Sequence, residues 1–167
     1  MAGMLEDAGY NVELTVDATP GSGYVRTGTS GTNFVDQIGR TVKADTSLVV
    51  VFGSRYDDGI IPREQVGSTA NTAIEKIRSI APKAAILVIG PAWPDDGYPG
   101  YITGIEWNLK ATAGADGAAF LDPIADHWFN GQAALIGSDG ISPTDAGHAY
   151  MAAHIEPAVL ALLPART

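Results

Sequence analysis

The chain contains no cysteine, which excludes disulfide bonds, thiolate metal sites and a cysteine nucleophile. Basic residues are also scarce, since 10 Lys and Arg stand against 19 Asp and Glu for a formal net charge of −9. Binding to a phosphate backbone needs clustered Lys and Arg, so this charge argues against a nucleic-acid partner. No apolar run approaches the ~20 residues of a membrane span, and residues 1–9 have no basic or apolar leader segment. We therefore expect no membrane partner and no export signal.

The composition that remains is that of one globular domain. Hydrophobic residues make up 46% of the 167 residues and charged residues 17%, while 20 Gly and 10 Pro separate the apolar runs. This length is sufficient to bury a single core, and no repeat or linker divides the chain. Three scattered histidines have no metal-ligand spacing. We predict a single domain over residues 1–167, with no metal and no cofactor.

Strand-like and helix-like segments alternate along the chain. Two fully apolar runs, 47–52 and 84–89, are typical of strands that are covered on both faces. We expect further strands over 11–16, where valine and leucine alternate, and over 118–121. Helices are expected over 34–42, from Pro62 to residue 81, over 102–113, and over 144–163 with a break or bend near Pro157. This order predicts α/β layers around a mainly parallel sheet, with ligands bound at the carboxyl ends of the strands.

Segments at three of these strand ends carry a resemblance to a known family. They are the glycine-rich turn Ala18-Thr19-Pro20-Gly21-Ser22-Gly23-Tyr24, the segment Phe52-Gly53-Ser54-Arg55-Tyr56-Asp57-Asp58, and Asp139-Gly140-Ile141-Ser142-Pro143 followed by Gly147-His148. They resemble conserved blocks of the SGNH (GDSL-type) hydrolases, and the likeness runs from about Gly9 to Leu163. It implies a three-layer α/β/α fold with a flavodoxin-like sheet of strand order 2-1-3-4-5.

The resemblance also implies a role for each matching position. The turn with Gly21 and Gly23 would give a backbone donor to the oxyanion hole, and Asp139 would orient the catalytic base. Tyr56 stands where the family has its asparagine donor, and Ser142 stands where it has the catalytic histidine. The Gly-Asp-Ser motif that carries the family's nucleophile does not occur in these 167 residues. These positions therefore resemble the remains of an active site.

Acyl transfer by serine needs a nucleophile, a base and oxyanion donors that act together. Since all three are altered, we predict a catalytically inactive SGNH-like domain and assign no catalytic residue. It would act as a structural or binding module, such as a phage virion protein (capsid decoration or tail) or a cell-surface accessory protein. The alternative is a serine esterase or carbohydrate deacetylase whose nucleophile lies outside this chain segment. His148, six residues beyond Ser142, is a weak alternative base.

Other polar and aromatic residues near the predicted ligand end have simpler interpretations. We interpret the acidic pairs at 57–58 and 95–96 as solvated loop carboxylates. A group of aromatic side chains would form either a surface that stacks on carbohydrate or contacts protein, or ordinary loop packing: Trp93, Tyr98, Tyr101 and Trp128. Ser142 and Thr144 are both candidates to cap the helix that follows them.

The segment 1–9 resembles the end of the family's first helix, so we expect the family's first strand to be lacking. That strand lies between the strands predicted at 11–16 and 47–52, and its absence would leave two backbone edges unpaired. Either these two strands pair directly, or another chain supplies a strand, or the true polypeptide starts upstream. The second alternative predicts a protein partner, through homo-oligomerisation or as an assembly partner.

Overall fold

Three parallel strands form the sheet in the computed structural model of the protein, which describes residues 2–164. Strand β1 (Leu48–Phe52) pairs with β2 (Ala85–Ile89), and β2 pairs with β3 (Ala119–Leu121). The strands predicted at 47–52, 84–89 and 118–121 are thus confirmed. The expected burial on both faces is nearly complete along the central strand β2, whereas the edge strand β1 leaves Val50 42% exposed.

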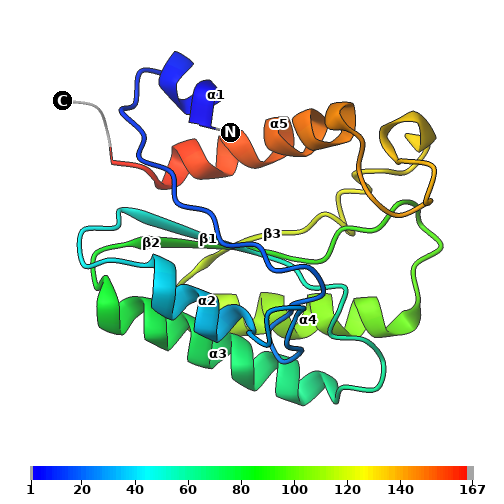
Figure 1. Ribbon diagram of the computed structural model, residues 1–167, viewed down its shortest axis with the longest axis horizontal. Helices are drawn as coiled ribbons and strands as arrows, with labels where there is room; N and C mark the ends of the chain where they lie inside the picture. The colour runs from blue at the N-terminus through cyan, green and yellow to red at the C-terminus, as the bar shows by residue number, and fades with distance from the viewer. Residues whose placement is uncertain (1, 165–167) are drawn as a thin grey trace.

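Helices cover both faces of this sheet and give three layers, α/β/α (Figure 1). Helices α2 (Phe34–Thr41), α3 (Arg63–Ile80) and α4 (Gly100–Ala115) lie on one face, and α5 (Asp145–Leu162) lies on the other with α1 (Ala2–Asp7) against it. A short 3-10 helix, η1, spans Ala133–Leu135. None of the described helices is long and apolar enough to cross a membrane. The predicted fold class is confirmed.

Local signals explain where the helices begin. Asn33 caps α2 and exchanges hydrogen bonds with Asp36, whose side chain accepts from the Asn33 amide. Thr144, rather than Ser142, caps α5, since its hydroxyl oxygen accepts from the Gly147 amide at 3.1 Å. Helix α5 runs unbroken over its 18 residues with Pro157 inside it, so the predicted break does not occur.

Two apolar cores lie on opposite faces of the sheet. The first packs the apolar stripe of α3 against α4, and includes the fully buried Val66, Ile77 and Leu109. The second packs α5 and α1 against the sheet through side chains such as Trp128 and Ile155. Burial of large apolar side chains on both faces stabilises the layers. The carboxyl ends of the strands are left open to a cavity.

The strand predicted over 11–16 is wrong. This segment pairs with no strand in the part of the chain that the structure describes, and Leu14 and Val16 are 56% and 72% exposed. Alternation alone cannot make a strand, because the backbone also needs a paired neighbour. Val12 instead packs against the core on the α5 side of the sheet, and surface ion pairs join Glu13 to Lys43 and the following Asp17 to Arg40 of α2.

Strand β1 consequently forms one edge of the described sheet. The first of the three predicted alternatives was direct pairing of the segment 11–16 with β1. The described residues form no such pairing. The other two alternatives, a strand supplied by another chain and a polypeptide that starts upstream, stay predictions.

Candidate functional site

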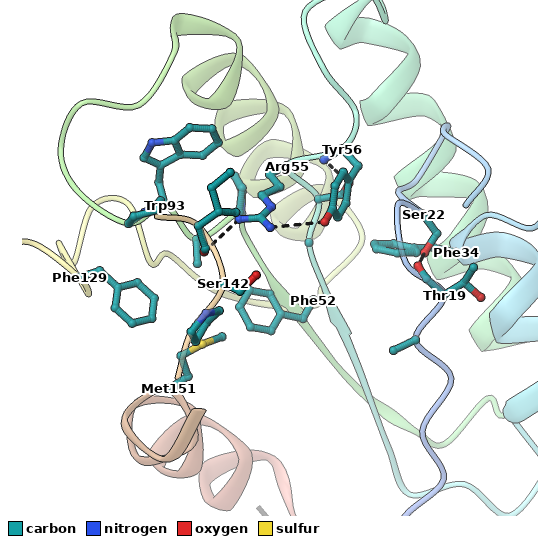
Figure 2. A pocket seen from close by; sticks show the side chains of 18 of the residues that line it. Thr19, Ser22, Phe34, Phe52, Arg55, Tyr56, Trp93, Phe129, Ser142 and Met151 are labelled. Atoms are coloured by element: carbon teal, nitrogen blue, oxygen red, sulfur yellow. Dashed lines mark hydrogen bonds between the residues drawn. The ribbon is translucent and has the colours of Figure 1, made fainter. Parts of the chain in front are cut away.

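A cavity of about 310 Å³ lies at the carboxyl ends of β1 and β2 (Figure 2). Loops from distant parts of the chain form it: the segment 17–22, the loop 53–56 after β1, the loop 91–94 after β2, and the segment 136–143 before α5. Tyr56 and Ser142, which are 86 positions apart in the sequence, both line the cavity. The expected convergence of strand-end loops thus produces one shared cavity.

Much of the cavity wall is apolar. Phe52 projects from the end of β1, Met151 projects from α5, and Phe129 and Trp93 come from two separate loops (Figure 2). Phe34, at the start of α2, lies on the other side near Ser22. A wall of this kind favours a ligand with apolar groups.

A buried carboxylate, Asp57, ties the glycine-rich turn to the loop after β1. Asp57 is 1% exposed, and it accepts hydrogen bonds from the amides of Tyr24 at 2.7 Å, Val25 at 3.0 Å and Arg26 at 2.9 Å. Its prediction as a solvated carboxylate is therefore wrong. The sequence analysis did not predict that three amides 31 to 33 residues away would turn toward it. Its neighbour Asp58 lies nearer the surface and pairs with the Arg26 guanidinium.

Gly23 allows this close approach. A Cβ atom at Gly23 would lie 2.5 Å from both Asp57 carboxylate oxygens and 2.5 Å from the Ser54 hydroxyl oxygen. No side chain fits in that space. Ser54 itself is buried, and its Oγ accepts from the amides of Tyr56 at 3.0 Å and Asp57 at 3.3 Å. The glycine of the turn thus has a packing reason that is independent of any oxyanion.

The loop that carries Ser142 is organised by Asp139. Ser142 Oγ donates to Asp139 Oδ2 at 2.6 Å, and Asp139 Oδ1 accepts from the amides of Ser142 at 2.8 Å and Ile141 at 3.0 Å. The Ser142 hydroxyl, and then these two amides, lower the pKa of the Asp139 carboxyl to about 2. Arg55 nearby lowers it further. Ser142 therefore uses its proton to hold the loop.

The hydroxyl groups of the cavity wall lie beside no histidine in the described part of the chain. Ser22 Oγ donates to the Thr19 carbonyl at 2.7 Å and accepts from Gln37 at 3.0 Å. No histidine is among the described residues that line the cavity. His148 is exposed in the first turns of α5, outside this wall. The described cavity wall thus offers hydroxyl groups without a histidine that could remove their protons.

The other predicted site residues are distributed differently. Gly21 has a φ of +78° and shapes the turn, although it is not itself part of the cavity wall. Trp93 lines the cavity, and Tyr101 packs against the first core. Tyr98 is half-buried, near the loop of His127. Trp128 is 2% exposed and stacks on His154, so its ring offers no free face to a carbohydrate.

The second acidic pair matches its interpretation as loop carboxylates. Asp95 and Asp96 are both exposed, Asp95 accepts from the Gly97 amide at 2.7 Å, and Asp96 pairs with His127 at 2.8 Å. Across residues 2–164, no group of three or more His, Asp or Glu side chains is arranged to hold a metal ion.

Comparisons with known proteins find relatives for almost the whole chain. No family model matches it. A protein named as a GDSL lipase, from Mycobacterium tuberculosis, is 42% identical over 158 residues, which are 93% of this chain and 68% of that protein.

Solved structures share the fold at lower identity. The crystal structure of TesA has a TM-score of 0.73 at 20% identity, over 96% of this chain and 85% of that one. A variant of an acetyl-xylooligosaccharide esterase from Geobacillus has a TM-score of 0.58 at 14% identity, over 80% of this chain and 71% of that one.

Proposed function

Because the chain belongs to the SGNH (GDSL-type) hydrolase family, we propose that it is a member that binds a ligand without hydrolysing it. The observation that carries this proposal is the Ser142 loop. Ser142 stands at the position of the family's base, and its hydroxyl donates to Asp139 at 2.6 Å. A serine hydroxyl cannot accept a proton at neutral pH as an imidazole does. The carboxylate that would orient a base is instead used to fold a loop.

Losses at the other catalytic positions support the same proposal. Tyr56 replaces the asparagine donor, and its side chain is 41% exposed. The motif that would carry the nucleophile is not in the 167 residues. Since triad members act as a unit, loss of one already removes most of the rate enhancement. Loss of several should leave no measurable turnover.

The cavity supports a binding role. Its volume of about 310 Å³ falls at the lower end of the range of small-molecule sites. Its wall combines large apolar side chains with a few polar groups, as ligand sites do. A domain that had lost only its chemistry would keep such a cavity, because the apolar wall does not depend on the triad.

Hydrolysis of p-nitrophenyl butyrate by the purified chain tests the loss of chemistry. We expect no turnover above that of a buffer blank, and no change in Asp139→Ala. The double variant Ser142→His with Tyr56→Asn restores two family positions and should stay inactive, because it still lacks the nucleophile. Turnover by the natural chain that Asp139→Ala abolishes would overturn the proposal.

A second candidate function is a serine esterase or carbohydrate deacetylase whose nucleophile lies outside the 167 residues. Two observations favour it: the 42% identical relative is named as a GDSL lipase, and β1 has an unpaired outer edge in the described sheet. Labelling of the native polypeptide from its host with a fluorophosphonate probe tests it. A labelled serine absent from the 167 residues would support this candidate, and an unlabelled protein would contradict it.

The role in a virion or at a cell surface stays a prediction, as does a protein partner that adds a strand beside β1. The molar mass in solution, measured by light scattering, tests homo-oligomerisation. A carbohydrate ligand also stays a prediction, and Trp93 is the predicted aromatic that lies at the cavity.

A further inference from the structure

Arg55 brings a cation to the wall of the cavity. It belongs to the loop after β1, and its guanidinium lies between Tyr56 and the Ser142 loop (Figure 2). Its Nη1 donates to the Ile141 carbonyl at 3.3 Å and its Nη2 donates to the Tyr56 hydroxyl at 3.4 Å. Both hydrogen bonds are long, and a guanidinium has five N–H groups. Arg55 therefore keeps donor capacity beyond these two contacts.

This cation has no carboxylate partner of its own in the described part of the chain. The other charged side chain in the wall, Asp17, is paired with Arg40 at 2.7 Å. Asp139 is close enough to Arg55 to be affected by its charge, but its oxygens accept from the Ser142 loop and form no ion pair with Arg55. Arg55 thus brings to the wall a positive charge that has no direct ion pair among the described residues, although Asp139 lies within range of its field.

We propose that Arg55 binds the carboxylate of an aliphatic monocarboxylic acid whose tail lies in the cavity. This inference rests on the proposed function and names its ligand class. The planar guanidinium donates two parallel hydrogen bonds to a carboxylate, which makes arginine well suited to this group. Tyr56 adds a donor, because its oxygen accepts from Arg55 and its own proton is available. The residue that replaces the family's asparagine would then contribute to binding.

The apolar part of the wall favours an apolar tail. Phe52, Phe129 and Met151 offer no hydrogen-bond partner of ordinary strength to a sugar hydroxyl, and burying an unpaired hydroxyl is unfavourable. A chain of methylene groups gains from the same surroundings. The cavity of about 310 Å³ fits a ligand of medium length. Octanoate is therefore a suitable probe.

Isothermal titration calorimetry with octanoate and with octanol separates the head group from the tail. We expect octanoate to bind the natural chain about 10- to 100-fold more tightly than octanol, as a charge-assisted pair provides. Arg55→Gln should weaken octanoate by a similar factor and leave octanol unchanged. Arg26→Gln is the matched control, since Arg26 is exposed, lies outside the cavity wall and pairs with Asp58, so octanoate binding should not change.

Two results would overturn this inference, and they differ in what they say of the proposed function. Equal affinities for octanoate and octanol, with no effect of Arg55→Gln, would remove the role of Arg55 and leave cavity binding intact. No binding of either ligand to the natural chain would overturn the inferred ligand class, and the proposed loss of hydrolysis would then still be decided by the hydrolysis assay. The comparison of the two ligands uses the natural chain, so it holds even if Arg55→Gln folds poorly.

Discussion

Two loops at the carboxyl ends of the strands are each folded around one aspartate, and they differ in where its partners come from. Asp57 is 1% exposed and accepts from three amides that lie 31 to 33 residues away along the chain. Asp139 is exposed and accepts only from residues two and three positions ahead, Ile141 and Ser142. One carboxylate joins distant segments, whereas the other shapes its own loop.

This difference predicts that the two loops tolerate substitution unequally. A change near Asp57 would leave buried amides without acceptors, which is costly. A change in the Asp139 loop affects exposed local hydrogen bonds that water can replace. The family position at Ser142 therefore tolerates substitution without loss of the fold. The same reasoning explains why the fold is kept in a chain whose catalytic positions are altered.

Asp57→Ala should produce the largest effect. Loss of the carboxylate leaves the amides of Tyr24, Val25 and Arg26 without their acceptor, for which we expect a loss of about 3–5 kcal/mol in the free energy of unfolding. Urea denaturation followed by circular dichroism measures it. Asp58→Ala is the matched control, because it removes a surface ion pair with Arg26 and an exposed hydrogen bond from the Ile60 amide, and it should cost about 1 kcal/mol or less. Equal effects of the two variants would break the comparison.

Gly23→Ala tests the same network from the other side. The added Cβ would lie 2.5 Å from the Asp57 carboxylate and from Ser54 Oγ, so we expect a loss of about 1–3 kcal/mol. Gly114→Ala is the control, since Gly114 lies in α4 with nothing within 4 Å of an added Cβ. It should stabilise the protein by about 0.5–1 kcal/mol. The two variants are compared by their urea midpoints, and a neutral Gly23→Ala would show that the turn can move away.

Most of the secondary structure could be predicted from the sequence, because the apolar patterns agree with local signals. The strands at 47–52 and 84–89 and the helix after Pro62 occur within a few residues of their expected ends. The prediction of a strand over 11–16 was wrong because the alternation of apolar residues indicates only that a segment is able to form a strand. Whether a strand forms depends on a neighbour, and no pattern within a segment shows whether its neighbour is there.

The candidate site could be predicted only in part. Tyr56, Asp139 and Ser142 were found from the resemblance, and the structure brings Tyr56 and Ser142 to one cavity. Asp57 and Arg55 were not found, because burial and donor capacity depend on which distant loops pack against them. A partial sign existed for Asp57, since it follows a buried strand and lies opposite a glycine-rich turn that could approach it closely.

The smallest effect should be the pH dependence that Asp139 confers. Its pKa is lowered to about 2 in the folded protein, against about 3.9 in an unfolded chain. Such a group contributes stability that is present above the unfolded pKa and is lost as the pH falls through the folded pKa. The difference in urea midpoint between the natural protein and Asp139→Asn should therefore be constant above about pH 5 and narrow between about pH 4 and pH 2.

Ser142→Ala should raise the pKa of Asp139 toward its ordinary value, because the Ser142 hydroxyl has the largest effect of the groups that lower this pKa. Titration of the Asp139 carboxyl carbon by NMR measures this pKa directly in both proteins. If the urea midpoints of the natural protein and Asp139→Asn differed by the same amount at pH 2 and pH 6, the exposed loop would contribute to stability through its packing alone. The contrast between Asp139 and Asp57 would then be one of burial and not of charge.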